Sequence, residues 1–288
     1  MLAAPAVPNG NAVELRALGV RRRPTTPRVS VIVPANDEAA HMPEVLPYLD
    51  GHHEVVVVVA QHDRESAAAA RAALPTVRIV AQTRRGKGNA LACGFAAATG
   101  DVIVMFEVDG SADPHEIPAF VTALARGADL AKGTRFITGG GSEDITVVRR
   151  LGSRFLNVAA STLTRSRFTD LCYGLNAFWA DQLAILHLPD PHHAGSHIML
   201  GDGFEIGAMI VGRLALSNAV IVEVPSFEYC RYHGDSHLKA LRDGLLVLWT
   251  LLLDRASGRR RVKPAGPQRP GWMLRAPAPQ LVESRLPA

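Results

Sequence analysis

Short apolar runs alternate with helical segments along the first part of the chain. The runs are rich in Val and Ile and are too short for helices, whereas the segments between them have helical spacing. The expected strands are Val29–Val33, Glu54–Val59, Val77–Val80 and Val102–Phe106. The expected helices are Met42–Leu49, Glu65–Leu74 and Asn89–Ala98. Strands separated by helices of about ten residues predict βαβ units, a parallel sheet and the α/β class of fold.

The second part of the chain is less regular. The expected helices are Thr146–Thr164, Phe204–Ser217 and Ser236–Asp254, and the expected strands are Gly174–Trp179 and Ala219–Val224. The longest apolar run, Gly244–Leu253, is about half of the ~20 residues that a helix needs to cross a bilayer. It is expected to be either a buried core helix or a helix in the lipid interface, next to the basic cluster Arg259–Arg261.

The composition is that of a globular protein with one large domain. Of the 288 residues, 48% are hydrophobic and 20% are charged, which is too apolar for a disordered chain. The three cysteines are odd in number and widely spaced, which argues against a disulfide scaffold and favours a reducing compartment such as the cytoplasm. Met1–Pro27 contains no apolar core of a signal peptide.

The charge is unevenly distributed between the two ends. From Arg255 onward the chain has eight basic residues and one acidic residue, a net +7, so the rest of the chain carries −3. We expect a disordered extension over 1–27, a single domain over 28–256 and a basic, Pro-rich, disordered tail over 257–288. A basic tail suits an anionic membrane surface or nucleic acid, although such tails are usually just solvated. Of these partners, a membrane surface remains open and nucleic acid is not expected.

Two carboxylates directly follow the expected strand Val102–Phe106. Because side chains alternate along a strand, Glu107 and Asp109 should point the same way. Converging carboxylates repel each other unless a cation lies between them, and their hard oxygen atoms suit Mg²⁺ or Mn²⁺. A metal with so few protein ligands completes its shell with substrate phosphate. The alternative is an acidic turn in which Asp109 caps the next segment.

A glycine-rich loop precedes the expected helix Asn89–Ala98. It reads Arg84-Arg85-Gly86-Lys87-Gly88-Asn89-Ala90, so glycines would admit a ligand, Lys87 would supply charge and the helix N-terminus would attract anions. The loop lacks the G-x-x-x-x-G-K-[ST] pattern, and an ordinary turn would explain it in isolation. The loop and the two carboxylates follow successive strands, however, and together they predict a site for a metal and a diphosphate.

These motifs, in this order, resemble those of glycosyltransferase family two, and within it the branch of dolichyl- and polyprenyl-phosphate sugar synthases. The first motifs are Val31–Glu38, Gly86–Ala90 with Gly94, Ala98–Asp101 and Glu107–Ser111. Lys132–Arg135 with Gly139-Gly140 resembles the family's Gly-Ser-Arg loop, and Asp170–Phe178 resembles its acceptor-side segment. Val222–Pro225 followed by Arg231, Gly234 and Ser236 resembles its closing motif. The resemblance extends from about Arg28 to Arg255.

The resemblance implies a GT-A fold, with a mostly parallel central sheet and helices on both faces. It also implies the transfer of a sugar from a nucleotide diphosphate sugar, with inversion and with Mg²⁺ or Mn²⁺. The metal would be held by Glu107, Asp109 and Ser111. The donor would contact Pro34, Ala35, Glu38, Asp63, Lys87, Gly88 and Arg135. The acceptor would contact Arg231, Ser236 and His237.

Three positions depart from the family pattern. Glu107 stands where the family usually has Asp, and Ala60-Gln61-His62-Asp63 replaces Asp-Asp-Gly-Ser, so the nucleobase is not identified. His237 stands where the lipid-phosphate branch tends to have Lys, which weakens the case for a phosphate acceptor.

His193 and His197 have the spacing of zinc ligands on a helix, but Pro189, Pro191 and Gly195 favour a solvated loop.

The candidate general bases are Asp202, Glu205 and Asp170. An acceptor hydroxyl needs a base, whereas an ionised lipid phosphate does not. The alternative is that Asp202 caps the helix that begins near Phe204, with Glu205 as its partner in a capping box.

Three functions remain open at this point. The first is a mannosyl- or glucosyltransferase that is peripheral on the cytoplasmic membrane face and acts on a polyprenyl phosphate. The second is a family-two transferase with a soluble hydroxyl acceptor. The third is a nucleotide-sugar binding protein without turnover.

Overall fold

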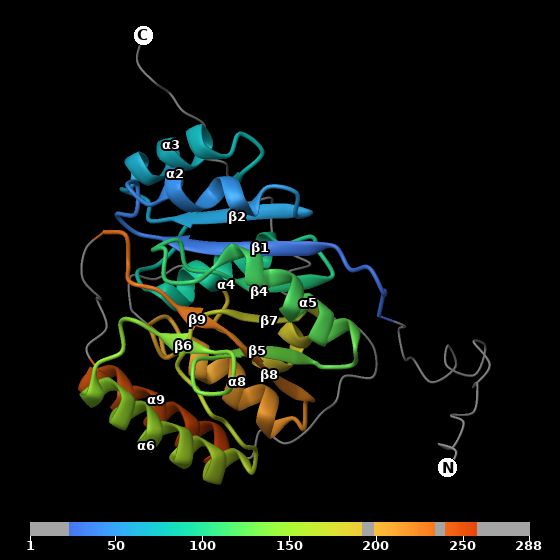
Figure 1. Cartoon of the computed structure of the whole chain (residues 1–288), viewed down its shortest axis with the longest axis vertical. Coiled ribbons are helices and arrows are strands. Elements are labelled where there is room, and N and C mark those ends of the chain that lie inside the picture. The colour runs from blue at the N-terminus through green and yellow to red at the C-terminus, as the bar shows by residue number, and fades with distance from the viewer. Residues whose placement is uncertain (1–22, 192–198, 234–239, 258–288) are drawn as a thin grey trace, which may run out of the picture.

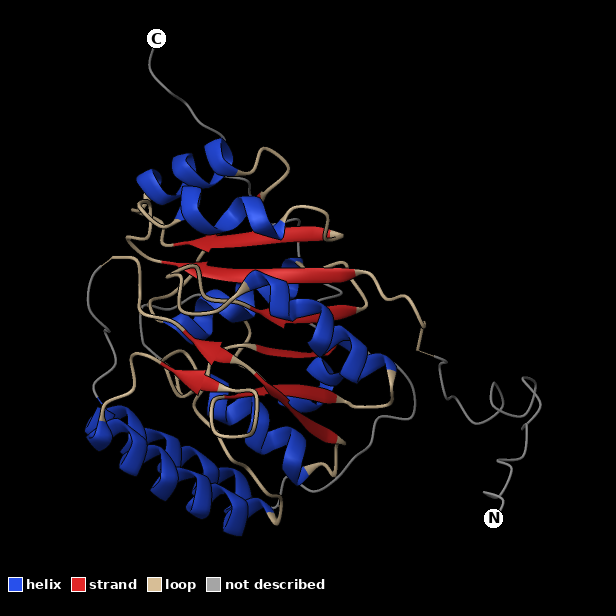
Figure 2. Ribbon diagram, viewed as in Figure 1, coloured by secondary structure: helices blue, strands red, loops and turns tan. Residues whose placement is uncertain are grey.

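The computed structural model describes residues 23–191, 199–233 and 240–257. Its centre is a seven-stranded sheet in the order β3-β2-β1-β4-β7-β5-β8 (Figures 1 and 2). The strands are β1 (Val29–Ala35), β2 (Glu54–Val59), β3 (Arg78–Ala81), β4 (Val102–Met105), β5 (Leu130–Thr134), β7 (Asn176–Trp179) and β8 (Ile221–Pro225). Only β7 runs antiparallel to its neighbours β4 and β5 within this sheet. The expected α/β fold with a mostly parallel sheet is therefore confirmed.

Helices cover both faces of the sheet (Figure 2). One face is covered by α2 (Met42–Val45), the short 3-10 helix η1 (Leu46–Leu49), α3 (Arg64–Ala73), η2 (Pro114–Glu116) and α5 (Ile117–Ala125). The other side carries α4 (Lys87–Ala97), α6 (Val147–Thr164), η3 (Ala180–Gln182), α7 (Leu183–Leu186), α8 (Ile206–Leu216) and α9 (Ala240–Ala256). α6 and α9 lie side by side at one corner of the molecule (Figure 1).

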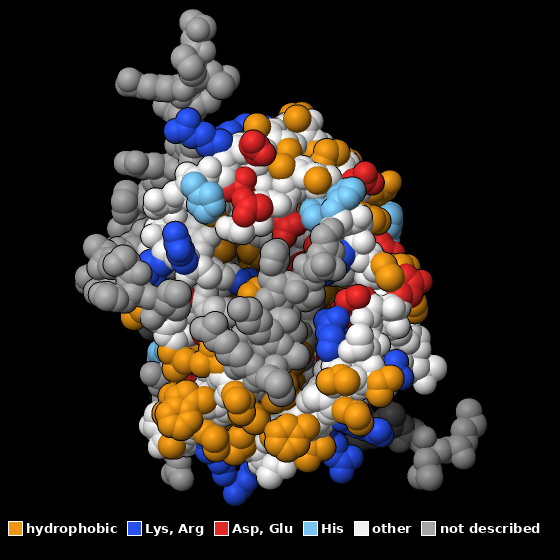
Figure 3. Space-filling view, turned by 90° about the vertical axis from the view of Figure 1, so that its left-hand side faces the viewer, with side chains coloured by type: hydrophobic (Ala, Val, Ile, Leu, Met, Phe, Trp, Pro, Cys, Tyr) orange, Lys and Arg blue, Asp and Glu red, His pale blue; other side chains and the backbone are white. Residues whose placement is uncertain are grey.

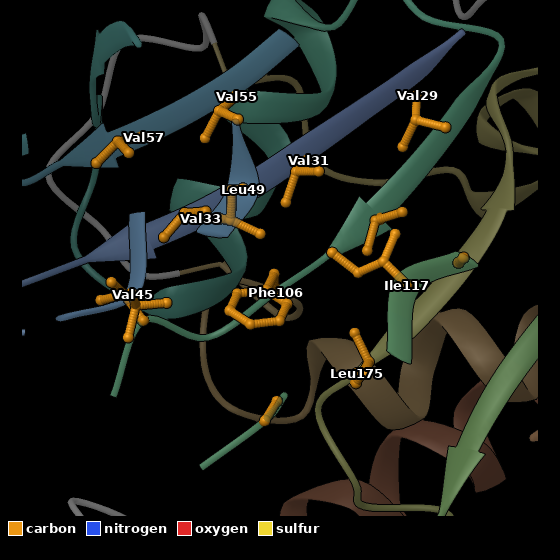
Figure 4. Close-up of a cluster of buried hydrophobic side chains, with 14 of the residues drawn as sticks. Val29, Val31, Val33, Val45, Leu49, Val55, Val57, Phe106, Ile117 and Leu175 are labelled. Atoms are coloured by element: carbon orange, nitrogen blue, oxygen red, sulfur yellow. The ribbon is translucent and has the colours of Figure 1, made fainter. Parts of the chain in front are cut away.

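The central strands are apolar on both sides because both faces of the sheet are covered. Val55–Val59 are all buried, and their side chains alternate between the two hydrophobic clusters. Figure 4 shows one of these clusters, in which Val31 and Val33 of β1 and the Phe106 ring gather with side chains from the helices that cover this face. This packing fixes the strand ends at which the candidate site residues stand.

Two elements near the middle of the chain were not expected from the sequence. Helix α5 follows the acidic turn, and Lys132–Thr134, which resembled a family loop, belongs to strand β5 instead. The Lys132 side chain is fully buried, and its Nζ donates to the carbonyl oxygens of Gly133 and Tyr173 at 3.1 and 3.0 Å. A small second sheet pairs β6 (Gly141–Ser142) with β9 (Phe227–Glu228).

The expected domain boundaries at residues 28 and 256 remain predictions. Most of the N-terminal extension and nearly all of the basic tail lie outside the described residues. Within the extension, Arg23 forms ion pairs with Asp129 at 2.7 Å and with Asp181 at 3.2 Å. None of the described helices is long and apolar enough to cross a membrane.

Candidate active site

The two expected carboxylates stand at the carboxyl end of β4. Val108, which lies between them, is buried in the core, so Glu107 and Asp109 face away from it. Oδ1 of Asp109 accepts hydrogen bonds from the backbone N (3.0 Å) and Oγ (2.6 Å) of Ser111. The turn needs the left-handed backbone of Gly110 (φ +82°). A carboxylate and a hydroxyl thus share one tight turn.

Each carboxylate is paired with a cation from another part of the chain. Lys87 Nζ lies 2.6 Å from Glu107 Oε1, and Arg231 Nη2 lies 3.1 Å from Asp109 Oδ2. The structure therefore brings together four residues that the sequence analysis assigned to metal, donor and acceptor. Their roles remain predictions, but their proximity does not depend on those roles.

The charge of Glu107 is stabilised by this pairing. Burial alone would raise the pKa of Glu107, but Lys87, followed by Arg231 and Arg135, lowers the pKa below its ordinary value. A lowered folded-state pKa means that Glu107 contributes stability above its unfolded pKa, and that this contribution is lost as the pH falls through the folded value. The carboxylate is therefore ionised at neutral pH.

The segment that carries Arg231 runs alongside the Asp109 turn. Tyr229 N donates to the carbonyl of Ser111 at 3.0 Å, and Tyr232 N donates to the carbonyl of Asp109 at 3.2 Å. A Cβ on Gly110 would come within 2.4 Å of the Tyr232 ring, so the glycine also makes room for this segment. The closing motif is thereby held directly against the candidate metal ligands. Ser236 and His237, expected at the acceptor, lie outside the described residues, as do His193 and His197.

The glycine-rich loop packs closely against another segment of the chain. A Cβ on Gly88 would lie 1.9 Å from the carbonyl oxygen of Gly201, and one on Gly86 would lie 2.1 Å from that of Asp202. The Gly88 amide donates to the Asp202 carbonyl at 2.8 Å. The N-terminus of α4 is thus occupied by protein, contrary to the expectation of an open anion site, and a donor contact at this loop would come from side chains such as that of Lys87.

Gly88→Ala is expected to lower the free energy of unfolding by about 3 kcal/mol, because the new methyl group would force two backbones apart. Gly207→Ala is the matched control, since Gly207 also lies in a helix and a Cβ there meets nothing within 4 Å. That control should gain about 0.5–1 kcal/mol. Urea unfolding measures both changes, and equal values for the two variants would contradict the packing described here.

Asp202 is buried in an ion pair with Arg84. Arg84 Nε and Nη2 each donate to one carboxylate oxygen at 2.9 Å, and the Met199 amide donates to Oδ2 at 2.9 Å. The expected capping box is wrong: α8 begins at Ile206, the Asp202 carboxylate does not cap it, and Glu205 at the cap position makes no cap hydrogen bond. With both oxygens engaged, Asp202 is suited to hold the loop in place.

Glu205 keeps one oxygen without a hydrogen bond. Its Oε1 accepts from the amides of Gly201 at 2.8 Å and Gly203 at 3.2 Å. Its Oε2 is buried and has no hydrogen-bond partner among the described residues. Asp170 differs, because its two oxygens accept from Arg135 Nε at 2.7 Å and Nη2 at 3.0 Å. Of the three candidate bases, Glu205 alone has a free acceptor oxygen within the described structure.

Arg135 is held behind the site by two carboxylates. In addition to Asp170, its Nη1 donates to Glu228 Oε2 at 2.9 Å, and only 7% of the residue is exposed. Burial alone would lower the pKa of Arg135, but these carboxylates raise it above its ordinary value. Arg135 therefore links β5 to β9, and its positive charge contributes to the lowered pKa of Glu107.

The expected nucleoside contacts gather at the end of β1. Pro34 and Ala35 end the strand, and the amide of Glu38 in the next loop donates to Ser66 Oγ at 2.9 Å. Asp63 caps α3 by accepting from Ser66 N at 3.0 Å, and it also accepts from the Asp37 amide at 2.7 Å. Asp63 is therefore engaged in holding this loop, while the strand end lies at the same edge of the sheet as the carboxylates.

Two aromatic residues at the site were not singled out from the sequence. Lys87 Nζ lies 5.7 Å from the ring centroid of Phe204, and 43% of Phe204 is exposed. Tyr232 is 53% exposed beside the Asp109 turn. Both are sequence neighbours of residues that the motifs did identify, Glu205 and Arg231, so exposed aromatics within those motifs were the available signal.

The chemistry of these residues fits a divalent metal that arrives with a phosphate ligand. No group of three or more His, Cys, Asp or Glu within the described ranges could hold a metal by itself. Two carboxylates and the Ser111 hydroxyl supply hard oxygen atoms, and substrate phosphate usually completes the shell of Mg²⁺. Both carboxylates are paired with a cation, Lys87 or Arg231, so their negative charges are neutralised at this site, as a bound metal ion would also do.

A mostly parallel sheet with two carboxylates at its carboxyl edge is the architecture of the GT-A class. The chain belongs to glycosyl transferase family 2, whose family model matches residues 30–181. The solved structure of glucosyl-3-phosphoglycerate synthase from Mycobacterium tuberculosis, with phosphoglyceric acid, has a similar fold: the TM-score is 0.59 at 22% identity, over 88% of this chain and 86% of that one. Another structure of that enzyme contains Mn²⁺, uridine diphosphate and glucosyl-3-phosphoglycerate, with a TM-score of 0.59 at 21% identity, over 88% and 87% of the two chains.

Curated relatives are similar over part of their length. Dolichol-phosphate mannosyltransferase of Pyrococcus furiosus is 28% identical over 221 residues, which are 74% of this chain and 59% of that protein. Undecaprenyl-phosphate 4-deoxy-4-formamido-L-arabinose transferase of Pseudomonas savastanoi is 28% identical over 162 residues, 52% of this chain and 47% of that protein. The chain spans about half the length of the curated relatives it matches.

Proposed function

We propose that the chain transfers a sugar from a nucleotide diphosphate sugar to a polyprenyl phosphate, with inversion and with Mg²⁺ or Mn²⁺. The observation that carries the proposal is the convergence of Glu107 and Asp109 with Lys87 and Arg231 at one strand end. Family membership and two relatives named as transferases that act on dolichol phosphate and undecaprenyl phosphate support the acceptor class. The free cysteines Cys93, Cys172 and Cys230 support the cytoplasmic face as the location.

The chain's own residues would prepare the site for a departing diphosphate. Asp109 and Glu107, with Ser111, would hold the metal, which when bound stabilises negative charge on the leaving diphosphate. Lys87 and Arg231 neutralise the carboxylates in this structure, and their side chains are 21% and 23% exposed. Both cations can therefore turn toward phosphate oxygens once another cation takes over the carboxylates.

The lipid-phosphate acceptor would approach from the side of Arg231. A phosphate oxygen is already ionised and needs no general base, so an engaged Asp202 and an engaged Asp170 are compatible with this chemistry. Arg231 is the basic residue of the closing motif that lies within the described structure. It would contact first the phosphate of the acceptor and then the diphosphate of the donor, or the reverse. Arg84 with Asp202 would keep Lys87 and Phe204 in place.

One observation favours a second candidate, a small hydroxyl acceptor. The unpartnered Oε2 of Glu205 is an acceptor oxygen of the kind that a general base needs. Glucosyl-3-phosphoglycerate synthase, the fold relative, is crystallised with phosphoglyceric acid. A protein that binds nucleotide sugars without turnover is the third outcome that the experiments below distinguish.

Nucleotide diphosphates with Mn²⁺ are expected to raise the melting temperature. Ligand at about 100 times its Kd adds about 2.7 kcal/mol, which raises the melting temperature of a domain this large by about 5 °C or more. A thermal-shift screen of UDP, GDP, ADP and CDP, with and without Mn²⁺, measures this and identifies the base. If no nucleotide shifts the transition with any divalent ion, the proposed donor site is wrong.

Transfer of a radiolabelled sugar then distinguishes the acceptors. Label that moves from the identified donor into an organic-extractable lipid supports the polyprenyl phosphate. Label only in a water-soluble product supports the second candidate, and Glu205→Gln should then abolish transfer while nucleotide binding persists. Binding without any transfer supports the third outcome.

A further inference from the structure

Helices α6 and α9 carry apolar side chains on the sides that face solvent. On α6 the exposed residues range from 61% to 77% exposure, and they are Val147, Val148, Leu151, Phe155 and Val158. On α9 they range from 38% to 67%, and they are Leu245, Trp249, Leu252 and Leu253. The spacing of three or four residues places each set along one side of its helix. We call these two stripes together the α6–α9 face.

The α6–α9 face is not needed to hold the helices on the body. The other side of α6 buries Asn157 and Ala160, and the other side of α9 buries Val247 and Leu251. Both helices pack on each other and on α8. Each helix is therefore already anchored, and its outward apolar side chains remain available for a partner. Figure 3 shows hydrophobic side chains gathered on the lower part of this side of the molecule.

Basic residues accompany the stripe on α6. Arg150 and Arg154 are exposed on α6, which contains no acidic residue, and Arg165 and Arg167 follow it with Arg165 exposed as the C-cap. Two neighbouring acids whose side chains the structure describes are engaged: Asp144 pairs with Arg149 at 2.8 Å, and Asp254 is buried against Arg213 at 2.8 Å. Lys and Arg side chains border the hydrophobic patch from below in Figure 3. The α6–α9 face is thus apolar with a cationic border.

We propose that the α6–α9 face docks on the surface of an anionic lipid bilayer. Apolar stripes with flanking arginines are the pattern of helices that lie in the membrane interface, where the arginines meet lipid phosphates. A second copy of the chain would instead bring the same cations of both faces close together, which costs free energy. The choice of a lipid partner extends the proposed function, because a polyprenyl phosphate resides in a bilayer.

The position of the face relative to the candidate site agrees with this partner. β1 and β2 end on the left in Figure 1, where α6 and α9 also lie, and Figure 3 looks at that side. The chain runs from Arg231, at the site, to α9 within nine residues. Docking through this face would therefore orient the candidate site near the membrane surface.

Vesicle co-sedimentation of the full chain tests the docking surface without requiring turnover. Vesicles of phosphatidylcholine with roughly 30% phosphatidylglycerol should bind the chain, pure phosphatidylcholine should bind it more weakly, and about 0.5 M salt should reduce the difference. Phe155→Ser and Trp249→Ser should each weaken binding about tenfold, because each removes a large apolar side chain from the interface. Tyr48→Ser is the matched control, since Tyr48 is an aromatic of similar exposure (61%) on η1, and it should bind like the unmodified chain.

Three results would overturn the proposal. The first is equal binding by Phe155→Ser and Tyr48→Ser. The second is a dimer in light scattering that Phe155→Ser dissociates, because a second copy would then cover the face. The third is no binding to anionic vesicles by a monomer. Nucleotide binding with Mn²⁺, measured on the same Phe155→Ser sample, distinguishes the two proposals. If this variant binds nucleotide but not vesicles, the result supports docking. If no sample binds nucleotide, including the unmodified chain, the result refutes the proposed function alone.

Discussion

Asp109→Asn should reduce sugar transfer by about a thousandfold or more, a loss of about 4 kcal/mol of transition-state stabilisation. The substitution keeps the size of the side chain and can keep its hydrogen bonds to Ser111, but it removes the charge that pairs with Arg231. Initial rates measured across a range of Mn²⁺ concentrations give the loss directly. We expect high Mn²⁺ to restore little of it, because a neutral amide is a poor ligand for a hard cation.

Asp113→Asn provides the control for this loss. Asp113 lies four residues further along, caps the short helix η2 and contacts His115 rather than the candidate site. Its substitution should leave transfer within about twofold and change the free energy of unfolding by less than about 0.5 kcal/mol, because Asn caps a helix about as well as Asp. Unchanged metal-dependent transfer by Asp109→Asn would remove Asp109 from the metal site.

Asp202→Ala should lower the free energy of unfolding by about 3–5 kcal/mol. The ion pair with Arg84 is almost completely buried, so removal of the carboxylate leaves a buried guanidinium without its charged partner. Asp144→Ala breaks the Arg149 ion pair, which is of similar length (2.8 Å against 2.9 Å) but is partly exposed, and should cost less than about 1 kcal/mol. Denaturant unfolding of the two variants measures the difference.

The isosteric variant Asp202→Asn separates a structural role from a chemical one. If Asp202 only holds the loop, this variant should lose stability and raise KM, while kcat falls little and its pH profile keeps its shape. A variant that is as stable as the unmodified chain but has no turnover would instead identify Asp202 as the base. Equal destabilisation by Asp202→Ala and Asp144→Ala would contradict the burial on which the argument rests.

The sheet could be predicted because its strands are short, apolar and separated by helices. Val55–Val59 could hardly be anything except a strand buried on both faces, and alternation correctly put Glu107 and Asp109 on one side. The sequence also led us to expect the Lys87 loop and the carboxylates close together, because they follow successive strands, although β2 and β1 lie between β3 and β4 in the sheet. Local pattern and sheet rules were sufficient for these features.

Strand β5 was missed because its pattern includes a lysine. Lys132 is fully buried and its ammonium group is bound by backbone carbonyls, and burial lowers its pKa to about 8. A sequence pattern treats lysine as a surface residue, so a strand of five residues with Lys132 and Gly133 reads as a loop. Only the tertiary structure supplies the carbonyls that make this burial tolerable.

The partners of Asp202 and the exposed side of α6 depend on contacts between distant segments. Asp202 and Arg84 are 118 positions apart. The glycines that allow their loops to pack together were interpreted from the sequence as making room for a ligand. For α6, hydrophobic spacing indicates an apolar stripe but not whether that stripe faces the core or solvent. The capping interpretation of Asp202 failed for the same reason, since it considered local partners alone.

The most direct test of the account is a crystal structure of the chain with Mn²⁺ and the nucleotide diphosphate that the thermal-shift screen identifies. Anomalous scattering from the metal would locate it independently of the protein. We predict one Mn²⁺ between the Asp109 carboxylate and the diphosphate, with Lys87 or Arg231 turned from its carboxylate to a phosphate oxygen. A nucleotide bound elsewhere, or a metal with no contact to Asp109 while Lys87 and Arg231 keep their carboxylates, would contradict the account.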